Sequence, residues 1–460
     1  MTAAAGVTAV PPPLAARLAA FAHGLRRDDI GAAAARHAAA LILDAVGCAL
    51  AGWQAEETSL VLRAARGLGG QGGASIIGGS APASLAAAVV ANAYLTTAVT
   101  ACDVYLPAHC HLTPEVVPAA LAIAEAEHAS GPALLTAVTA GLEVASRLLR
   151  AVDYTEFRGR GWHSPGVIGP VGAAVAAGLL LGLGEDELRS AMSLAVSQAA
   201  GTFAAWPTTA VKFHQARGAL AGVIAATLAA QGFQAGPEPF EAPDGGLFAS
   251  YAPGDASAAL AGLGRDWECE QISVRLWPGA AAVQALLTAL LGTGRRLPGA
   301  AELTGMEIRV PPATYQAHRD VVHPAGTFEA LLSFHYVAAA TIAHGRFGID
   351  LAGAARRDDP QIATLIDRRI RLLPDPAVPR GGVHVTLRRH GGGAVVIREQ
   401  AAAGTPGRAA TPAQLRGKFL AGAAPRIGQA AARQLLDRLG RLEDVTDCAD
   451  LLRLTQGGAG

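Results

Sequence analysis

Residues 96–127 read TTAVTACDVYLPAHCHLTPEVVPAALAIAEAE and place a cluster of polar side chains directly before a predicted helix. Thr113 can cap that helix with its hydroxyl, Pro114 suits the first turn because it lacks an N–H, and Glu115 complements the positive helix end. Since His111 lies beside this helix N-terminus, we expect a neutral imidazole that can accept a proton near pH 7. The cluster comprises Asp103, Tyr105, His109, Cys110 and His111.

The composition is that of a well-buried globular protein without a bulk charge. The chain has 460 residues, more than one hydrophobic core usually holds, so we expect two domains. Hydrophobic residues make up 51% of the chain and charged residues 16%, which excludes a disordered protein. Lys+Arg and Asp+Glu both total 37, so no net charge draws the protein to nucleic acid or to an anionic membrane.

The sequence predicts a cytoplasmic protein with reduced thiols. Its five cysteines include no CxxC pair and no zinc-type Cys/His spacing. The first basic residue, Arg17, follows three prolines, which is not typical of a secretory signal. Residues 167–184 form the longest uncharged apolar run, but glycines and Pro170 interrupt it, and it is shorter than the roughly 20 strongly apolar residues of a membrane span. We interpret it as a buried helix.

Helical periodicity dominates the first half of the chain. Residues 14–66 predict two or three helices, and residues 83–232 predict long Ala-rich helices whose small side chains allow close packing. Residues 67–72, GLGGQG, match the GxGxxG pattern of dinucleotide sites. However, they follow a helix and precede a strand-like segment at residues 75–77, which is the reverse of the required order. We therefore expect no nucleotide cofactor.

After about Trp267 the pattern changes to alternation. Residues 306–310, 383–387 and 395–397 alternate apolar and polar side chains, which indicates strands, and the RHGGG segment at 389–393 is typical of a hairpin loop. Thr411 then begins a capping box that opens helices running to the C-terminus. The predicted fold is mainly α, with a large helical domain from residues 1–267 and 404–460 and a smaller α+β domain from residues 268–403.

Three further helix starts repeat the arrangement at His111. His163 stands at the start of one predicted helix, Lys212 and His214 stand near the start of another, and Arg275 precedes a third. If these helix starts converge, their free N–H groups and positive dipole ends form an anion site that the two cations reinforce. A small carboxylate is the natural ligand. A histidine could remove a proton from the carbon beside that carboxylate while the cations stabilise the enolate-like charge, which serves elimination, decarboxylation or epimerisation without a metal.

Each of these residues also has a purely structural interpretation. A histidine at a helix start can be a capping or packing residue, Lys212 could be solvated, and Arg275 could stack on Trp277. Asp103 could cap the helix or orient a histidine, and a reactive Cys110 is a further alternative.

Six segments together resemble the MmgE/PrpD superfamily, which includes 2-methylcitrate dehydratase, cis-aconitate decarboxylase and an iminodisuccinate epimerase. The resemblance covers almost the whole chain. The segments are LILDAVGCALAG (41–52), ASLAAAVVANAYLTTA (83–98), HLTPEVVPAALAIAE (111–125), GWHSPGVIGPVGAAVAAGLLLGL (161–183), VKFHQARGALAGVIAATLAAQGF (211–233) and LLSFHYVAAATIAHG (331–345).

The resemblance implies a helical domain built from both chain ends, a smaller lid, a homodimer and catalysis without a cofactor. It implies catalytic roles for His111, His163 and Lys212, and substrate-binding roles for His214, Arg275 and Tyr315. Asp103 and Tyr105, in the polar cluster beside His111, are further candidates for substrate binding. The chain departs from the family where the HxxDxDD run is reduced to TAVTACDV at residues 97–104, in which only Asp103 survives, and where a lysine becomes Arg275. The Cys and His that usually follow the aromatic-Pro pair are absent from WPGAAAVQ. These losses leave fewer groups to hold a tricarboxylate, which argues against ordinary 2-methylcitrate dehydration.

We therefore expect a cofactor-independent lyase, of dehydratase or decarboxylase type, that acts on a small carboxylic acid. His111 would be the base with His163 assisting, while Lys212 and Arg275 hold carboxylate. Two alternatives stay open. One is an isomerase or epimerase that uses the same proton abstraction, and the other is a catalytically degenerate relative that binds a carboxylate or a protein without turnover. We expect no nucleic acid, membrane or metal partner.

Overall fold

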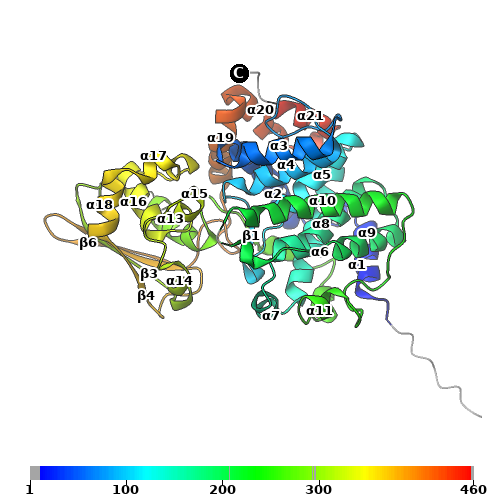
Figure 1. Ribbon diagram of the computed structural model, residues 1–460, viewed down its shortest axis with the longest axis horizontal. Coiled ribbons are helices and arrows are strands. Elements are labelled where there is room, and N and C mark those ends of the chain that lie inside the picture. The colour runs from blue at the N-terminus through cyan, green and yellow to red at the C-terminus, as the bar shows by residue number, and fades with distance from the viewer. Residues whose placement is uncertain (1–10, 207, 293, 295–296, 457–460) are drawn as a thin grey trace, which may run out of the picture.

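Helices form most of the structure and gather in two lobes (Figure 1). The computed structural model describes residues 11–206, 208–292, 294 and 297–456. The larger lobe, called here the helical body, is mainly α, and the whole fold is mainly α as predicted. The body contains α1 (Leu14–Gly24), α2 (Ala32–Ala51), α3 (Thr58–Gly69), α4 (Leu85–Ala98), α5 (Thr113–Ala126), α6 (Gly131–Ala151), α7 (Tyr154–Gly159), α8 (Ser164–Leu180), α9 (Glu185–Ser197), α10 (Ala210–Ala230), α11 (Leu247–Ser250), α12 (Ala256–Leu260), α19 (Pro412–Ile427), α20 (Gln429–Leu439) and α21 (Cys448–Leu454).

Both ends of the chain share the core of the helical body. Its buried apolar side chains run from Leu14 to Val274 and resume from Phe419 to Leu452, and α19 packs against α2. The buried helix α8 contacts α5, α6, α9 and α10. A Cβ added to Gly141 on α6 would lie 2.5 Å from the carbonyl oxygen of Gly172 on α8, so only glycine permits this approach. The predicted close packing of small-residue helices is confirmed here.

Two helical segments of the body are long and apolar enough to cross a membrane by length and composition, residues 32–54 and α6. Within their most apolar windows, 67% and 83% of the residues are buried inside the protein. Core helices of globular proteins pass the same composition test, and α2 and α6 pack against other helices of the body.

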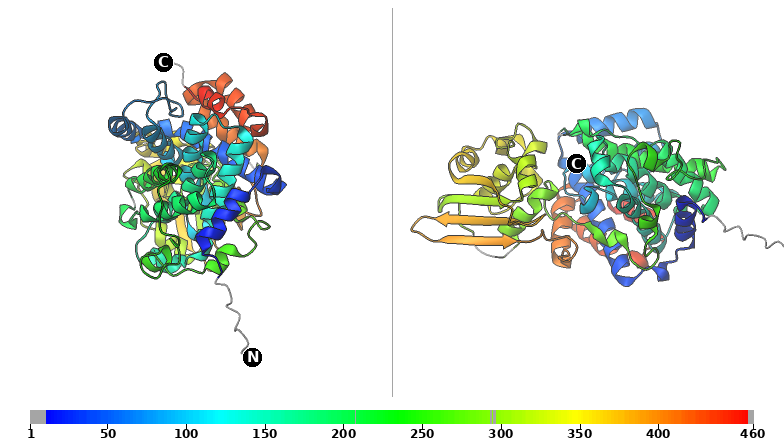
Figure 2. Two further views of the ribbon diagram at one scale, coloured as in Figure 1. Left: turned by 90° about the vertical axis from the view of Figure 1, so that its right-hand side faces the viewer. Right: turned by 90° about the horizontal axis from the view of Figure 1, so that it is seen from below.

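The smaller lobe, called here the lid, packs helices on a four-stranded sheet (Figure 2). The strand order is β4-β3-β5-β6, in which β3 and β4 are parallel and the other pairs antiparallel. The predicted strands appear as β3, β5 and β6, and the predicted hairpin joins β5 to β6 through three glycines with φ between +83° and +89°. The lid contains α13 (Gln284–Leu291), β3 (Leu303–Val310), α14 (Pro312–His318), α15 (Thr327–Ala330), α16 (Phe334–His344), α17 (Ala354–Arg357), α18 (Pro360–Arg369), β4 (Ile370–Pro374), β5 (Val383–Arg389) and β6 (Ala394–Glu399).

The strand predicted at residues 75–77 is wrong. The segment leads into a turn in which Gly79 N donates to Ile76 O at 2.7 Å, and several of its other backbone groups bond side chains instead of a neighbouring strand. Ser75 N donates to Glu125 Oε2 at 2.8 Å, Asn92 Nδ2 donates to Ser75 O at 2.9 Å, and Ile77 N donates to Asn92 Oδ1 at 2.8 Å. An apolar pair of isoleucines therefore marks burial here and not sheet pairing.

Candidate active site

A loop between α4 and α5 brings the predicted site residues together. Within it, β1 (Val104–Tyr105) pairs antiparallel with β2 (Ile272–Ser273), so the residues before α5 lie beside the strand that leads to Arg275. A second bridge between Tyr105 and Cys110 closes a tight turn, in which His109 adopts a left-handed φ of +42°. This double pairing fixes both Asp103 and His111 relative to the start of α5.

Asp103, and not Thr113, caps α5. The Asp103 carboxylate accepts hydrogen bonds from Leu112 N at 2.9 Å, Thr113 N at 3.0 Å and the Thr113 hydroxyl at 2.5 Å. The predicted Thr113 cap is therefore wrong, because a fully buried carboxylate from outside the helix takes that place. The helix-dipole role predicted for Glu115 is also not supported, since its buried carboxyl has no hydrogen-bond partner among the described residues and burial raises its pKa well above the usual range.

His111 is held in one tautomer by the loop backbone. Its Nδ1 lies 2.6 Å from the carbonyl oxygen of Asp103, which can only accept, so Nδ1 carries the proton. Nε2 has no bonding partner within the described residues and keeps a free lone pair. Burial, followed by the charge of Arg275, lowers the His111 pKa to about 3, which agrees with the expected neutral imidazole but assigns its cause to desolvation.

His163 and His214 share one proton. Their Nδ1 atoms lie 3.0 Å apart, so one of the two must donate and the other accept. His163 is buried at the start of α8, where its backbone N–H donates to Gly201 O at 2.9 Å. His214 is half-buried on α10. Burial and then the neighbouring histidines His214 and His111 lower the His163 pKa well below its usual value. The pair is therefore neutral and lies within electrostatic reach of His111.

Lys212 is buried at the start of α10 and faces the lid. Its ammonium donates to the carbonyl oxygen of Ala98 and lies 5.1 Å from the centre of the Phe328 ring on α15. Phe328 and Leu332 of the lid pack on Val211 beside it. Burial lowers the Lys212 pKa to about 8, so the group exchanges a proton near neutral pH.

Arg275 supports the same loop from its other side. Nε donates to Cys102 O at 2.5 Å, one terminal nitrogen donates to Gly279 O at 3.1 Å, and the other lies 3.2 Å from Cys102 Sγ. The N–H donors of the guanidinium therefore bond protein acceptors, and its charge contributes positive potential to the site. It does not stack on Trp277 within the described structure, because no cation–π contact joins them.

Backbone carbonyl groups in and next to the loop accept hydrogen bonds from several cations. Ala98 O accepts from Lys212, Ala101 O from Lys418 at 2.7 Å, and Cys102 O from Arg275, while Asp103 O accepts from His111. Lys418 also pairs with the buried Asp44 at 2.5 Å and lines a cavity of about 630 Å³ between α2, α19 and the lid. That cavity lies behind the loop and includes none of the site histidines.

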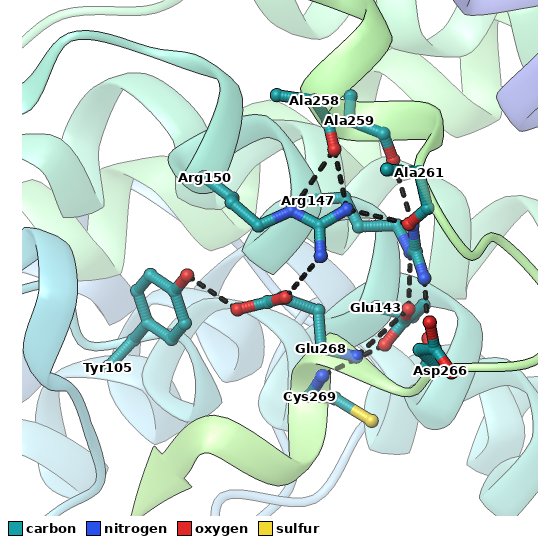
Figure 3. Close-up of polar contacts among 10 residues, drawn as sticks. All are labelled: Tyr105, Glu143, Arg147, Arg150, Ala258, Ala259, Ala261, Asp266, Glu268 and Cys269. Carbon is teal, nitrogen blue, oxygen red and sulfur yellow. Dashed lines mark hydrogen bonds and ion pairs between the residues drawn. The ribbon is translucent and has the colours of Figure 1, made fainter.

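The two predicted tyrosines lie elsewhere. The Tyr105 hydroxyl donates to Glu268 Oε1 at 2.7 Å and belongs to an ion network with Arg150 (Figure 3), so it is committed to Glu268 and not to the site histidines. Tyr315 packs half-buried against the lid core, and no contact joins it to the site in the described structure. All five cysteines are buried free thiols, as expected, and burial raises the Cys110 pKa well above its usual range, which disfavours a reactive thiolate.

The sequence reasoning missed the lid's contribution to the site. Phe328 covers Lys212, and Arg380, between β4 and β5, places a terminal nitrogen 3.3 Å from His109 Nε2. These residues follow their partners by more than a hundred positions, and neither stands in a recognisable motif. The free Nε2 of His111, the neutral pair of His163 and His214, and the titrating Lys212 thus make a site that can move protons beside a bound anion.

The chain belongs to the MmgE/PrpD family. The MmgE/PrpD N-terminal domain matches residues 16–259, and the MmgE/PrpD C-terminal domain matches residues 277–442. The chain is 27% identical over 376 residues to cis-aconitate decarboxylase of Mus musculus, covering 77% of this chain and 75% of the relative. It is 26% identical over 370 residues to cis-aconitate decarboxylase of Homo sapiens (77% and 76%), and 28% identical over 296 residues to that of Aspergillus terreus (62% and 60%).

Proposed function

We propose that this protein is a cofactor-independent lyase of the decarboxylase or dehydratase type that acts on a small carboxylic acid, with cis-aconitate the first substrate to test. The observation that carries the proposal is His111, whose Nδ1–H is fixed by Asp103 O and whose free Nε2 shares a site with the titrating Lys212. The similarity to proteins named cis-aconitate decarboxylase supports the reaction class.

In the proposed mechanism, His111 is the base, and Lys212 both binds a carboxylate and supplies a proton. Lys212 holds a substrate carboxylate, helped by the N-terminus of α8 and the potential of Arg275. In a dehydration, His111 Nε2 takes the proton from the carbon beside that carboxylate, and the electron pair expels a hydroxyl that an acid protonates. In a decarboxylation, the electron pair of the breaking C–C bond stays on carbon, carbon dioxide leaves, and the carbon takes a proton from Lys212. His163, oriented by His214, assists His111.

The reaction class can be tested directly with purified protein. The protein is incubated with cis-aconitate and with related di- and tricarboxylates in heavy water, and products are identified by NMR and mass spectrometry. We expect multiple turnovers with loss of carbon dioxide or water. Solvent deuterium entering a substrate that loses neither would instead identify an isomerase or epimerase.

A degenerate carboxylate-binding relative is the second candidate. Two observations favour it. The Asp103 carboxylate caps α5, and the Arg275 guanidinium donates to the backbone carbonyls of Cys102 and Gly279, so both groups are already bonded within the protein. Tight binding of a carboxylate with less than one turnover would support it. We also propose a cytoplasmic homodimer, as the family resemblance implies, and light scattering at one protomer mass of 46.5 kDa would contradict the dimer.

We expect the pH profile of turnover to follow Lys212. Its pKa of about 8 means that the ammonium form dominates below pH 8 and is lost above it, so kcat/KM is expected to fall as pH rises through about 8. His111 stays neutral across this range because its pKa is about 3. Lys212→Met is expected to lower kcat about 100-fold and to remove the alkaline limb. A wild-type profile that stays flat to pH 9.5 would exclude Lys212 as the proton donor.

A further inference from the structure

The loop that carries Asp103 and His111 is strained at Thr100. This residue has a left-handed φ of +54°, which a β-branched side chain rarely adopts, and its buried hydroxyl has no hydrogen-bond partner among the described residues. A backbone in such a conformation persists only where its surroundings hold it. The donors that bond the carbonyl groups from Thr100 onward therefore set the path of the loop toward His111.

Donors from outside the loop hold its carbonyl groups in turn. Gly279 N donates to Thr100 O at 3.0 Å, Lys418 Nζ to Ala101 O at 2.7 Å, and Arg275 Nε to Cys102 O at 2.5 Å. The next carbonyl oxygen, that of Asp103, accepts from His111 Nδ1. Lys418 thus bonds the loop two residues before the carbonyl that fixes the tautomer of His111. It forms no hydrogen bond or ion pair with a site histidine in the described structure.

Lysine is rare in this chain, and both lysines bond this segment. Lys212 and Lys418 are the only lysines among the 37 lysine and arginine residues of the sequence. Lys212 is buried and donates to Ala98 O, and the Lys418 side chain is 12% exposed and donates to Ala101 O. An ammonium group is a compact donor, whereas a guanidinium is a wide planar fork. The only two positions with lysine are therefore positions where a compact donor reaches a carbonyl of this segment.

The packing of α19 on α2 fixes the position of Lys418. A Cβ added to Gly47 on α2 would lie 2.9 Å from a ring carbon of Phe419 on α19, so glycine allows this close approach. Across it, Lys418 Nζ pairs with the Asp44 carboxylate at 2.5 Å. Burying two charges costs about as much as their attraction returns, so such a pair contributes little to the stability of the fold. Its effect is to direct an ammonium N–H at Ala101 O.

We propose that Lys418 is a positioning residue for the active site: held by Asp44, it fixes the Ala101 carbonyl and, through the loop, the orientation of His111. The inference rests on the proposed function for the role of His111 as the base. Because Lys212 binds the substrate carboxylate, loss of Lys418 lowers kcat and leaves KM nearly unchanged. A displacement of the base by about 1 Å is enough to lower a rate about 100-fold.

Kinetics and NMR test this role with a double variant. Lys418→Met alone would leave the buried Asp44 carboxylate without a counter-ion, so it is combined with Asp44→Asn, which keeps the side-chain volume and removes the second charge. The double variant is expected to lower kcat about 30-fold and to change KM by less than about threefold. Nitrogen NMR of histidine-labelled protein, with the His111 signal assigned by its loss in His111→Asn, should show that the proton no longer stays on Nδ1 alone. Arg416→Met removes an exposed charge from the same helix, and this matched control should change neither kcat nor the signal.

A chemical rescue separates the N–H donor from the charge. Lys418 lines the cavity of about 630 Å³, so propylammonium can occupy the space that Lys418→Ala leaves. Propylammonium is expected to restore part of kcat, whereas tetramethylammonium, a cation without an N–H donor, should not.

The outcomes separate the position of the loop from the reaction. A double variant with wild-type kcat and an unchanged His111 signal would overturn the proposal, as would equal rescue by the two ammonium ions. If the wild type turned over no carboxylate, the proposed lyase would fail, while a changed His111 signal in the double variant would still show that Lys418 orients this histidine. Turnover that falls in His111→Asn and not in the double variant would do the reverse.

Discussion

Replacing His111 with asparagine is expected to lower kcat of a reaction that begins with proton abstraction, as in a dehydration, by about 10²- to 10⁴-fold while changing KM little, because it removes the proton acceptor and keeps the loop in place. The Asn side-chain amide can still donate to Asp103 O, as His111 Nδ1 does now at 2.6 Å. What it lacks is the free Nε2 lone pair. Kinetics on the substrate found in the carboxylate screen, with and without added imidazole, measures the effect, and imidazole is expected to restore part of the rate.

A surface histidine provides the matched control for that substitution. His128 pairs with Asp447 on the surface of the helical body and has a φ of +52°, a conformation that asparagine adopts readily. His128→Asn should therefore leave kcat within about twofold. If His111→Asn kept kcat within tenfold of the wild type, His111 would not be the base, and the neutral pair His163 and His214 would be the next candidates.

The helix starts that carry the site could be predicted because their signals are local. His163 precedes a Ser-Pro pair, and Thr411 begins a capping box whose two hydrogen bonds both form in the structure. Such signals need only a few neighbouring residues to be satisfied. The cap of α5 is different, since Thr113 has the right side chain at the right position, yet Asp103, ten residues earlier, offers a charged acceptor to three donors at once.

The roles of the substrate-binding candidates depend on contacts that no local pattern encodes. The guanidinium of Arg275 could bind a carboxylate through two hydrogen bonds. However, the β1–β2 pairing places it beside Cys102 O, and this backbone carbonyl accepts a hydrogen bond from Arg275 Nε instead. Likewise the sequence pattern did not predict β4, because this strand begins at Ile370, directly after α18, and its partner β3 lies some sixty residues earlier. The lid residues Phe328 and Arg380 complete the site only after the two lobes have packed together.

Replacing Arg147 with methionine is expected to lower the free energy of unfolding by about 3–5 kcal/mol, because it leaves the buried Glu143 carboxylate without its counter-ion. The two side chains form an ion pair that is 0% and 1% exposed (Figure 3). Arg147 also donates to Ala259 O and Ala261 O, both at 2.9 Å, which would lose a partner. Urea unfolding followed by circular dichroism measures the loss.

Arg150→Met separates this buried pair from the network around it. Arg150 pairs with Glu268 at 2.6 Å and is 29% exposed, so solvent can replace the contact and we expect a loss of about 1 kcal/mol. Glu143→Gln combined with Arg147→Met should recover part of the single-mutant loss, since a neutral amide still accepts from Cys269 N, now 2.8 Å from the carboxylate. If Arg147→Met lowered the free energy of unfolding by less than 1 kcal/mol, the attraction between Glu143 and Arg147 would only offset the cost of burying their charges. Cys269 lies just before β2, which aligns Asp103 and His111 through β1. A loss of several kcal/mol would therefore show that the loop carrying the base depends on the ion pair of Glu143 and Arg147.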